Sequence, residues 1–179
     1  MNRTQPVMLL PAEETDINEI YRLCQEVAEK SPLSKWGKDY PNEAILTEDV
    51  KSRTLYKVVL DGRIVSIIQI RDWNDFMKNE EAEDTGDWDT AIHHPCGLGR
   101  FCVSPSLQGK GLGRQILTAA LQKAYRMGYD GAFFHVVGGN MPALHLYDSM
   151  GFHYTGEVDE YHMHFLCYEM KLNQEILSA

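Results

Sequence analysis

The sequence predicts an α/β fold, and three observations lead to this prediction. The chain has 179 residues, of which 44% are hydrophobic, so it can bury a core of useful size. Short runs rich in β-branched and aromatic residues alternate with longer segments whose apolar residues recur at helical spacing. A strand, a glycine loop and a helix follow one another over 97–127. No repeat or linker interrupts this pattern, so residues 1–179 are predicted to form a single domain.

The first part of the chain is predicted to contain two helices and a β-hairpin. Asp61-Gly62 between two β-rich runs is a strong hairpin signal. Thr15 or Asp16 is a suitable cap for the first helix, whose apolar face has 3.6-residue spacing. The predicted elements are a strand over 7–10, a helix from about 17 that ends at Ser31-Pro32, a helix over 43–51, and strands over 55–60 and 63–70.

The second part of the chain is predicted to alternate strands and helices before a final antiparallel pair. Gly128 is suited to end the long helix, and Pro142 to occupy the first turn of the next one. The predicted elements are strands over 97–103 and 131–137, helices over 111–127 and up to about 150, and strands over 152–158 and 162–172. The whole order is therefore βααβββαβαββ.

An acidic segment lies between the third and fourth predicted strands. Residues 73–94 are predicted to be irregular, and 74–89 carry six of the nine net negative charges. The segment is either a solvated, mobile insertion or an acidic rim that attracts a cationic partner. Its seven carboxylates belong to Asp75, Glu80, Glu81, Glu83, Asp84, Asp87 and Asp89.

Composition excludes several classes of protein. A net charge of −9 disfavours binding to nucleic acid. No apolar run approaches the ~20 residues of a membrane span, and residues 1–6 lack the apolar core of a signal peptide. The four cysteines form no C-x-x-C pair and have apolar neighbours, as expected of reduced thiols. We therefore expect a cytoplasmic protein with no nucleic-acid or membrane partner, for which a homodimer is one candidate assembly.

The glycine loop that follows Phe101–Val103 is the strongest functional signal. Ser104-Pro105 stops the strand, and Gly109, Gly111 and Gly113 alternate before the helix. Backbone N–H groups at a helix start carry partial positive charge and bind phosphate or pyrophosphate. Glycine lets such a group approach the backbone closely.

Two common nucleotide-binding loops do not fit this pattern. A Walker A loop needs Ser or Thr after the Gly-Lys pair, but Gly111 follows Lys110. In the Rossmann turn the third glycine would come one position later than Gly113. A phosphotransferase is a further alternative, although no convincing magnesium-binding pattern accompanies the loop.

Three features in this order resemble the GNAT superfamily of N-acetyltransferases. Gln108-x-x-Gly111-x-Gly113 resembles the family's pyrophosphate loop for acetyl-coenzyme A. Asn140 and the segment 143–152, with Tyr147 and Gly151-Phe152, resemble its Asn-x-x-A-x-x-x-Y-x-x-x-G-F motif. The resemblance covers 97–172 well, and the earlier residues only in element order. It implies a mixed, twisted, mostly antiparallel sheet of about seven strands, with helices on both faces and the fourth and fifth strands splayed apart.

The resemblance implies acetyl-CoA as cofactor, bound between the splayed strands. The backbone of Phe101, Cys102 and Val103 would bind the pantetheine arm, with the Val103 N–H facing the thioester oxygen. Asn140 would bond the pantetheine, and the Tyr147 hydroxyl would act as general acid toward the coenzyme sulfur. The pyrophosphate would rest on Gln108, Gly109, Lys110, Gly111, Leu112, Gly113 and Arg114.

The implied activity is acetyl transfer to a primary amine of a small molecule or peptide, by direct attack in a ternary complex. A lysine-like amine, with a pKa of ~10.4, must first lose a proton. Many relatives carry a glutamate on the fourth or fifth strand, whereas 97–100 contain no carboxylate. His135, five residues before Asn140, is the candidate general base because an imidazole accepts a proton near neutral pH. The other candidates are Glu157, Asp159, Glu169 and a chain of water molecules.

Several alternatives remain open at this stage. Trp36 and Tyr40 either contact the acceptor or plug a loop. A catalytically inactive coenzyme A-binding regulatory module fits the missing carboxylate, although intact Asn140 and Tyr147 argue against it. The histidines form no pattern of a structural zinc site, so no metal is predicted. The acceptor can be a polyamine, an amino acid, an aminoglycoside or a protein N-terminus.

Overall fold

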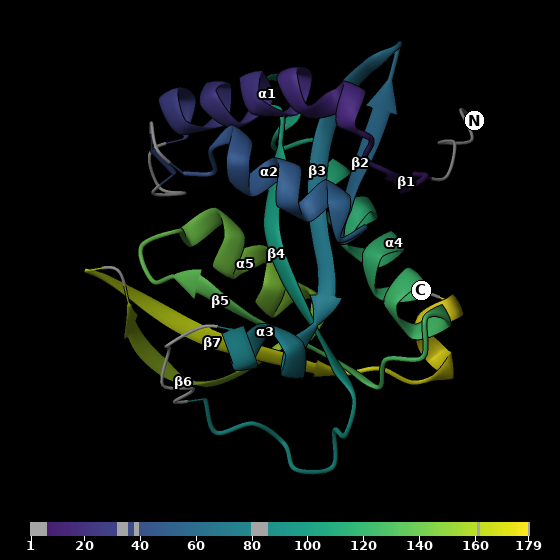
Figure 1. The fold of residues 1–179 in the computed structure, drawn as a ribbon. Helices are drawn as coiled ribbons and strands as arrows, with labels where there is room; N and C mark the ends of the chain where they lie inside the picture. The colour runs from purple at the N-terminus through teal and green to yellow at the C-terminus, as the bar shows by residue number, and fades with distance from the viewer. Residues whose placement is uncertain (1–6, 32–35, 38–39, 80–85, 161, 179) are drawn as a thin grey trace.

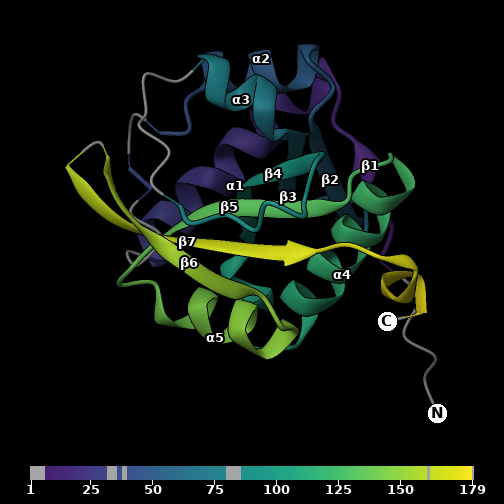
Figure 2. The same cartoon turned by 90° about the horizontal axis from the view of Figure 1, so that it is seen from below.

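The computed structural model describes residues 7–31, 36–37, 40–79, 86–160 and 162–178. Within them a seven-stranded twisted sheet carries helices on both faces (Figure 1). Seen from below, α1, α2 and α3 cover one face of the sheet, and α4 and α5 cover the other (Figure 2). The elements are β1 (Leu10–Pro11), α1 (Ile17–Lys30), α2 (Glu43–Lys51), β2 (Leu55–Leu60), β3 (Arg63–Asp72), α3 (Trp73–Asn79), β4 (Pro95–Val103), α4 (Leu112–Arg126), β5 (Gly131–Val137), α5 (Met141–Met150), β6 (His153–Glu160) and β7 (Met163–Lys171).

The sheet divides at the junction of β4 and β5. Its strand order is β1-β2-β3-β4-β5-β7-β6, and every neighbouring pair except β4–β5 is antiparallel. β4 and β5 pair in parallel only where they begin, from Pro95↔Gly131 to Gly97↔Phe133. From Leu98 onward β4 continues along β3, while β5 continues along β7. The prediction of a mixed, mostly antiparallel sheet with splayed fourth and fifth strands is confirmed.

Each face of the sheet has its own apolar core. On the α4 side, the buried stripe of α4 packs against aromatic residues of β5, α5 and β7. On the opposite face, α1 and α2 bury a smaller cluster against β2 and β3. Helix α4 ends before Gly128, whose φ of +97° explains why glycine stands there. The buried residues of the α4 stripe are Ile116, Leu117, Ala120, Leu121 and Ala124.

Three predictions about the chain before β4 need correction. The strand expected over 7–10 is the two-residue β1, which pairs only with Lys57 and Tyr56. Asp16 precedes α1, but its carboxylate does not cap the helix; it binds the Lys57 ammonium and accepts the Glu13 N–H. The segment predicted to be irregular contains the helix α3.

Helix α3 forms because its first residues have both a cap and a buried face. The Asp72 carboxylate accepts the Asp75 N–H at 2.9 Å, as an N-terminal cap does. Trp73 is buried, and Phe76 follows it on the same side with the ring centroids 5.3 Å apart. The acidic residues 80–85 lie outside the described residues. Beyond them, the Asp87 N–H donates to Thr155 O at 2.8 Å, which places this segment beside β6.

None of the helices in the described ranges is long and apolar enough to cross a lipid bilayer. All four cysteines are buried, and none is paired in a disulfide.

Candidate active site

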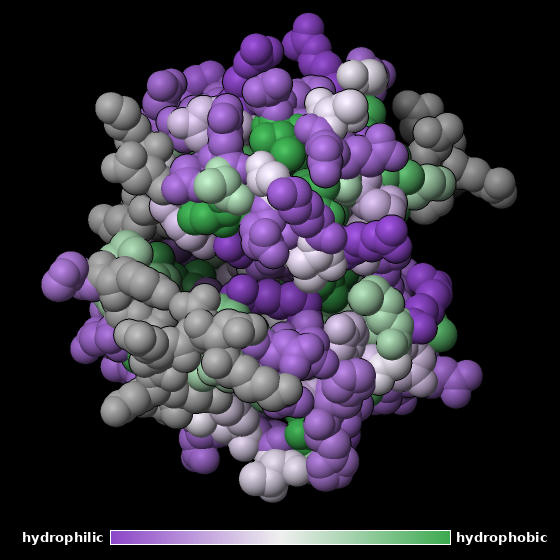
Figure 3. All heavy atoms as spheres, in the orientation of Figure 1, coloured by the Kyte–Doolittle hydropathy of each residue, from purple (hydrophilic) through white to green (hydrophobic). Residues whose placement is uncertain are grey.

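The divergence of β4 and β5 opens a cavity of about 640 Å³. Its lining comes from both faces of the sheet, with residues of α1, α2 and α3 on one side and α4 and α5 on the other. On the face drawn in Figure 3, a hollow separates the half that contains α1 and α2 from the half that contains α3, and apolar residues show inside it.

Four of the predicted site residues meet in this cavity. Phe101 of β4, His135 of β5, Asn140 at the start of α5 and Tyr147 within α5 all contribute to the lining. Cys102, by contrast, turns its side chain to the opposite side of β4 and is buried under α1. The prediction for Cys102 concerned only its backbone, which lies on β4 as that of Phe101 does.

Tyr147 sits in an aromatic cluster beneath β5. Its ring centroid lies 4.4 Å from that of Phe134 and 5.8 Å from that of Phe152. Helix α5 ends at Met150, and the turn at Gly151, with φ +85°, directs Phe152 into the cluster. Burial raises the pKa of Tyr147, so its hydroxyl keeps its proton at neutral pH. A protonated hydroxyl at the cavity wall can donate a proton or a hydrogen bond.

His135 enters the cavity from the other face of the sheet. Because side chains alternate along a strand, it points away from the cluster that holds Phe134. Its ring lies 5.5 Å from Trp73 at a steep angle and 6.1 Å from Trp88, nearly parallel to it. Trp88 also stacks flat on Phe133, with centroids 4.4 Å apart. Trp88, which belongs to the segment after residue 85, thus packs against one face of the His135 imidazole.

The alternative bases lie away from the cavity lining. Glu169 is buried, and its carboxylate accepts the Asp89 N–H at 2.9 Å. Glu157 and Asp159 stand on β6 beside the ring of His164, at 3.4 and 2.9 Å. No Asp or Glu belongs to the described lining of the cavity. His135 is the sequence-predicted base that lines the same cavity as Tyr147 and Asn140.

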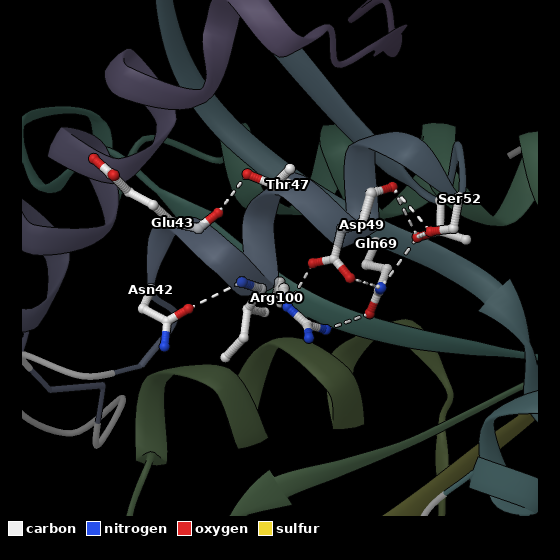
Figure 4. A network of polar contacts seen from close by, with 9 residues as sticks. Asn42, Glu43, Thr47, Asp49, Ser52, Gln69 and Arg100 are labelled. Carbon is white, nitrogen blue, oxygen red and sulfur yellow. Dashed lines mark hydrogen bonds and ion pairs between the residues drawn. The ribbon is translucent and has the colours of Figure 1, made fainter.

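A buried polar network behind the cavity was not predicted from the sequence (Figure 4). The Arg100 guanidinium on β4 lies 2.7 Å from the Asp49 carboxylate on α2, and donates to Gln69 Oε1 on β3 at 2.6 Å. Gln69 in turn donates to Asp49 Oδ1 at 2.7 Å. Burial raises the pKa of Asp49, although the charges of Arg100 and Arg71 oppose this shift.

The network coincides with an irregularity in β4. Ile67 pairs with Cys102 but Gln69 pairs with Gly99, so β4 holds one more residue than β3 over this stretch. Arg100 lies in the bulge with φ +44°, an uncommon conformation for a residue with a side chain. Its bonds to Asp49 and Gln69 fix its side chain, which also lines the cavity.

Two glycines of the loop have a left-handed backbone conformation. Gly109 and Gly111 have φ of +73° and +81°, where side chains are strained. Helix α4 starts at Leu112, and the first-turn N–H groups of a helix have no acceptor within the helix. The Gln108 side chain turns back and donates to Val103 O at 3.0 Å. The Arg114 guanidinium bonds Ser149 of α5, and Lys110 bonds Ser106 O at 2.9 Å.

Among the described residues, no three His, Cys, Asp or Glu side chains gather in a way that could hold a metal ion. Trp36 and Tyr40 both line the cavity, with centroids 6.5 Å apart.

Comparison with known proteins agrees with this geometry. The model of the acetyltransferase (GNAT) family matches residues 15–152. A streptothricin acetyltransferase from Streptomyces lavendulae is 29% identical over 111 residues, which are 61% of this chain and about half, 49%, of that protein.

Solved structures share the fold over nearly the whole chain. A GNAT-family acetyltransferase from Streptococcus agalactiae has a TM-score of 0.74 at 18% identity, over 95% of this chain and 98% of that one. The ribosomal-protein-S18-alanine N-acetyltransferase from Escherichia coli has a TM-score of 0.68 at 16% identity, over 94% and 95%. A putative acetyltransferase from Salmonella typhimurium, solved with its cofactor acetyl-CoA, has a TM-score of 0.66 at 16% identity, also over 94% and 95%.

Proposed function

Because the chain belongs to the GNAT acetyltransferase family, we propose that it transfers an acetyl group from acetyl-CoA to a primary amine of a small molecule or peptide. We propose further that the amine attacks directly, in a ternary complex. The observation that carries this proposal is the cavity between β4 and β5, which joins the two faces of the sheet. Phe101 of its lining lies close to Gly113, the last glycine of the loop.

The residues present fit acetyl-CoA. The left-handed glycines and the start of α4 form an anion site suited to a pyrophosphate. The edge of β4 that faces β5 has no strand partner from Leu98 onward, so its peptide groups can pair with the amides of an extended arm. The acetyl-CoA held by the Salmonella typhimurium structure supports this assignment. The cofactor supplies an activated thioester when bound.

The chain's own groups handle the two proton transfers. His135 accepts a proton from the incoming ammonium, because a neutral imidazole has one ring nitrogen with a free lone pair. Tyr147 keeps its proton through burial and donates it on the cofactor side of the cavity. The two side chains reach the cavity from opposite faces of the sheet, so the acid and the base do not compete for one position.

The competing proposal is a coenzyme A-binding regulatory module without catalysis. The absence of a carboxylate from the described lining favours it. A thiol-release assay with a panel of amines separates the two, since only an enzyme produces free coenzyme A in proportion to the amine.

The cofactor site is tested by Gly111→Glu, with Gly111→Ala as the matched control. Both changes put a side chain on the same left-handed backbone, and a Cβ there meets no atom within 4 Å. Only glutamate adds a negative charge to the anion site. Calorimetry should show micromolar acetyl-CoA binding for the wild type, weakened binding for the alanine variant and none for the glutamate variant. Equal binding by all three proteins contradicts the proposed cofactor site.

A further inference from the structure

Trp88 packs against His135 and against the strand that carries it. The indole lies at 11° to the imidazole with the ring centroids 6.1 Å apart, and it stacks on Phe133 at 4.4 Å. Trp73 meets the same imidazole edge to face, with the centroids 5.5 Å apart. Aromatic rings attract each other in both arrangements at separations of about 4.5–7 Å. The imidazole is therefore held between a parallel ring and a perpendicular one, which restricts its rotation.

The segment that carries Trp88 is attached to β6 and β7 on either side of the indole. The Asp87 N–H donates to Thr155 O of β6 at 2.8 Å. The Asp89 N–H donates to the Glu169 carboxylate of β7 at 2.9 Å. These two hydrogen bonds come immediately before and after Trp88 in the chain, so they fix the place of the indole over β5.

Glu169 is suited to hold this segment. It stands opposite Phe133 in the register of β5 and β7, so the two side chains lie on the same face of the sheet, as Trp88 does. The Glu169 side chain is buried and does not line the cavity. Its printed contact needs only an oxygen that accepts an N–H, which an amide oxygen also supplies. We call Glu169 the anchor of the segment.

Gly86 lets the indole fold back over the backbone. A Cβ at this position would lie 2.3 Å from Cε2 and 2.5 Å from Cζ2 of Trp88, well inside van der Waals contact. A side chain at residue 86 must therefore displace the indole. Gly86→Ala consequently moves Trp88 without changing its side chain.

We propose that Trp88 is a positioning residue that holds the His135 imidazole in one orientation, with Glu169 as the anchor of its segment. This proposal rests on the role of His135 as general base in the function proposed above. A general base must direct its nitrogen at the proton, and a misplacement of about 1 Å can cost on the order of 10²-fold in rate. Trp88 does not line the cavity, so it acts through the imidazole and not on the acceptor.

Nuclear Overhauser contacts of the His135 ring protons report this orientation without any acceptor. The His135→Gln spectrum assigns the signals, and we expect contacts to Trp73 and to Phe165, whose centroid lies 6.5 Å from the imidazole. Trp88→Leu and Gly86→Ala should weaken these contacts. Trp88→Phe keeps a flat ring and should retain them, which also covers the case in which the leucine variant does not fold. The proposal is overturned if the wild type lacks the contacts or if they are unchanged in both Trp88→Leu and Gly86→Ala.

Kinetics tests whether the orientation serves the base. The rate of coenzyme A release is measured with the fastest acceptor among spermidine, L-phenylalanine, kanamycin and a peptide with a free N-terminus. We expect Trp88→Leu to lower kcat about tenfold with little change in the KM for acetyl-CoA, and Trp88→Phe to recover most of the loss. In a His135→Gln background, Trp88→Leu should have no further effect, because the group that it positions is already gone. A wild-type kcat in Trp88→Leu, or an equal further loss in the His135→Gln background, refutes the positioning role.

Two substitutions of Glu169 separate an anchor from a base. Glu169→Gln keeps an oxygen for the Asp89 N–H but cannot take up a proton near neutral pH, so it should keep most of kcat and the contacts of the His135 ring. Glu169→Ala removes the acceptor and should lower kcat as Trp88→Leu does. Equal loss of activity in both variants would indicate that Glu169 is a base, and full activity in both would show that it anchors nothing.

The spectra separate failure of this inference from failure of the proposed function. If no acceptor in the panel releases coenzyme A, the proposed activity is wrong for these amines, and the contacts of the His135 ring decide the inference alone. Contacts that Trp88→Leu weakens and Trp88→Phe retains then support the inference. Contacts that do not depend on Trp88 overturn it whatever the activity.

Discussion

Replacing Asp49 by asparagine should destabilise the protein, because it leaves the Arg100 guanidinium buried without its counter-charge. The side chains of Arg100 and Asp49 are 12% and 8% exposed, and their charged groups lie 2.7 Å apart. Removing one partner of a buried ion pair costs about 3–5 kcal/mol. Asparagine keeps the shape and one acceptor for Gln69, so we expect a loss of about 3 kcal/mol in the free energy of unfolding.

Removing both charges should cost much less than the two single changes together. Burial raises the pKa of Asp49 even beside two arginines, which means that desolvation outweighs their attraction. The double variant Asp49→Asn/Arg100→Met should therefore lose no more stability than Asp49→Asn alone. Urea unfolding of the four proteins forms a double-mutant cycle, and we expect a coupling free energy of about 2 kcal/mol or more. Single losses below about 1 kcal/mol, or strictly additive losses, would refute this reasoning.

The Arg100→Met variant adds a pH dependence with a definite sign. Without the guanidinium that lowers it, the folded pKa of Asp49 should lie further above its unfolded value of about 3.9. A carboxyl group whose pKa is higher in the folded state than in the unfolded state stabilises the fold at pH values below the unfolded pKa. This stabilisation is lost as the pH rises through the pKa of the folded state. The deficit of Arg100→Met relative to the wild type should thus shrink as the pH falls toward 4. A deficit that is constant with pH would show that Asp49 does not titrate in this way.

Two further changes test the proposed proton transfers. Tyr147→Phe keeps the ring in its aromatic cluster and removes only the hydroxyl, so acetyl-CoA should bind as before while kcat falls about 10²-fold, the low end for general acid catalysis. Tyr154→Phe, at an exposed tyrosine, is the control. Full activity of Tyr147→Phe would show that Tyr147 is a packing residue. His135→Gln should flatten the acidic limb of the kcat/KM profile, with His153→Gln as control, and an unchanged limb would place the base at Glu157, Asp159, Glu169 or a water chain.

Local signals explain which elements the sequence predicted well. Helix α2 and strands β2 and β5 have the predicted bounds, because a cap, a tight turn or flanking glycines mark their ends. Asn42 caps α2 by accepting the Ile45 N–H at 2.9 Å. The glycine loop was predictable for the same reason, since its left-handed positions demand glycine. Helix α3 was missed because its cap and aromatic pair stand at the edge of a strongly acidic segment, which was interpreted as solvated.

The polar network could not be predicted, because no local pattern joins its members. Asp49, Gln69 and Arg100 lie on three different elements, and only the folded sheet and α2 bring them together. Arg100 also stands in a bulge, whose position depends on the register of β4 against β3. The aromatic neighbours of His135 could not be predicted for the same reason, since Trp73 and Trp88 lie far from His135 in the sequence.

The arrangement of the cavity supplies an argument for the proposed direct attack rather than a covalent acetyl-enzyme. A covalent route through a thiol or a serine hydroxyl needs Cys or Ser at the reaction centre, and the described lining contains neither. Burial raises the pKa of Cys96 to about 12 and that of Cys102 well above its usual value, so neither thiol is ionised at neutral pH. Tyr147 and His135 instead face the cavity from opposite sides of the sheet. A cofactor on the α5 side and an acceptor on the α3 side can then be present together, which direct transfer requires and a two-step route does not.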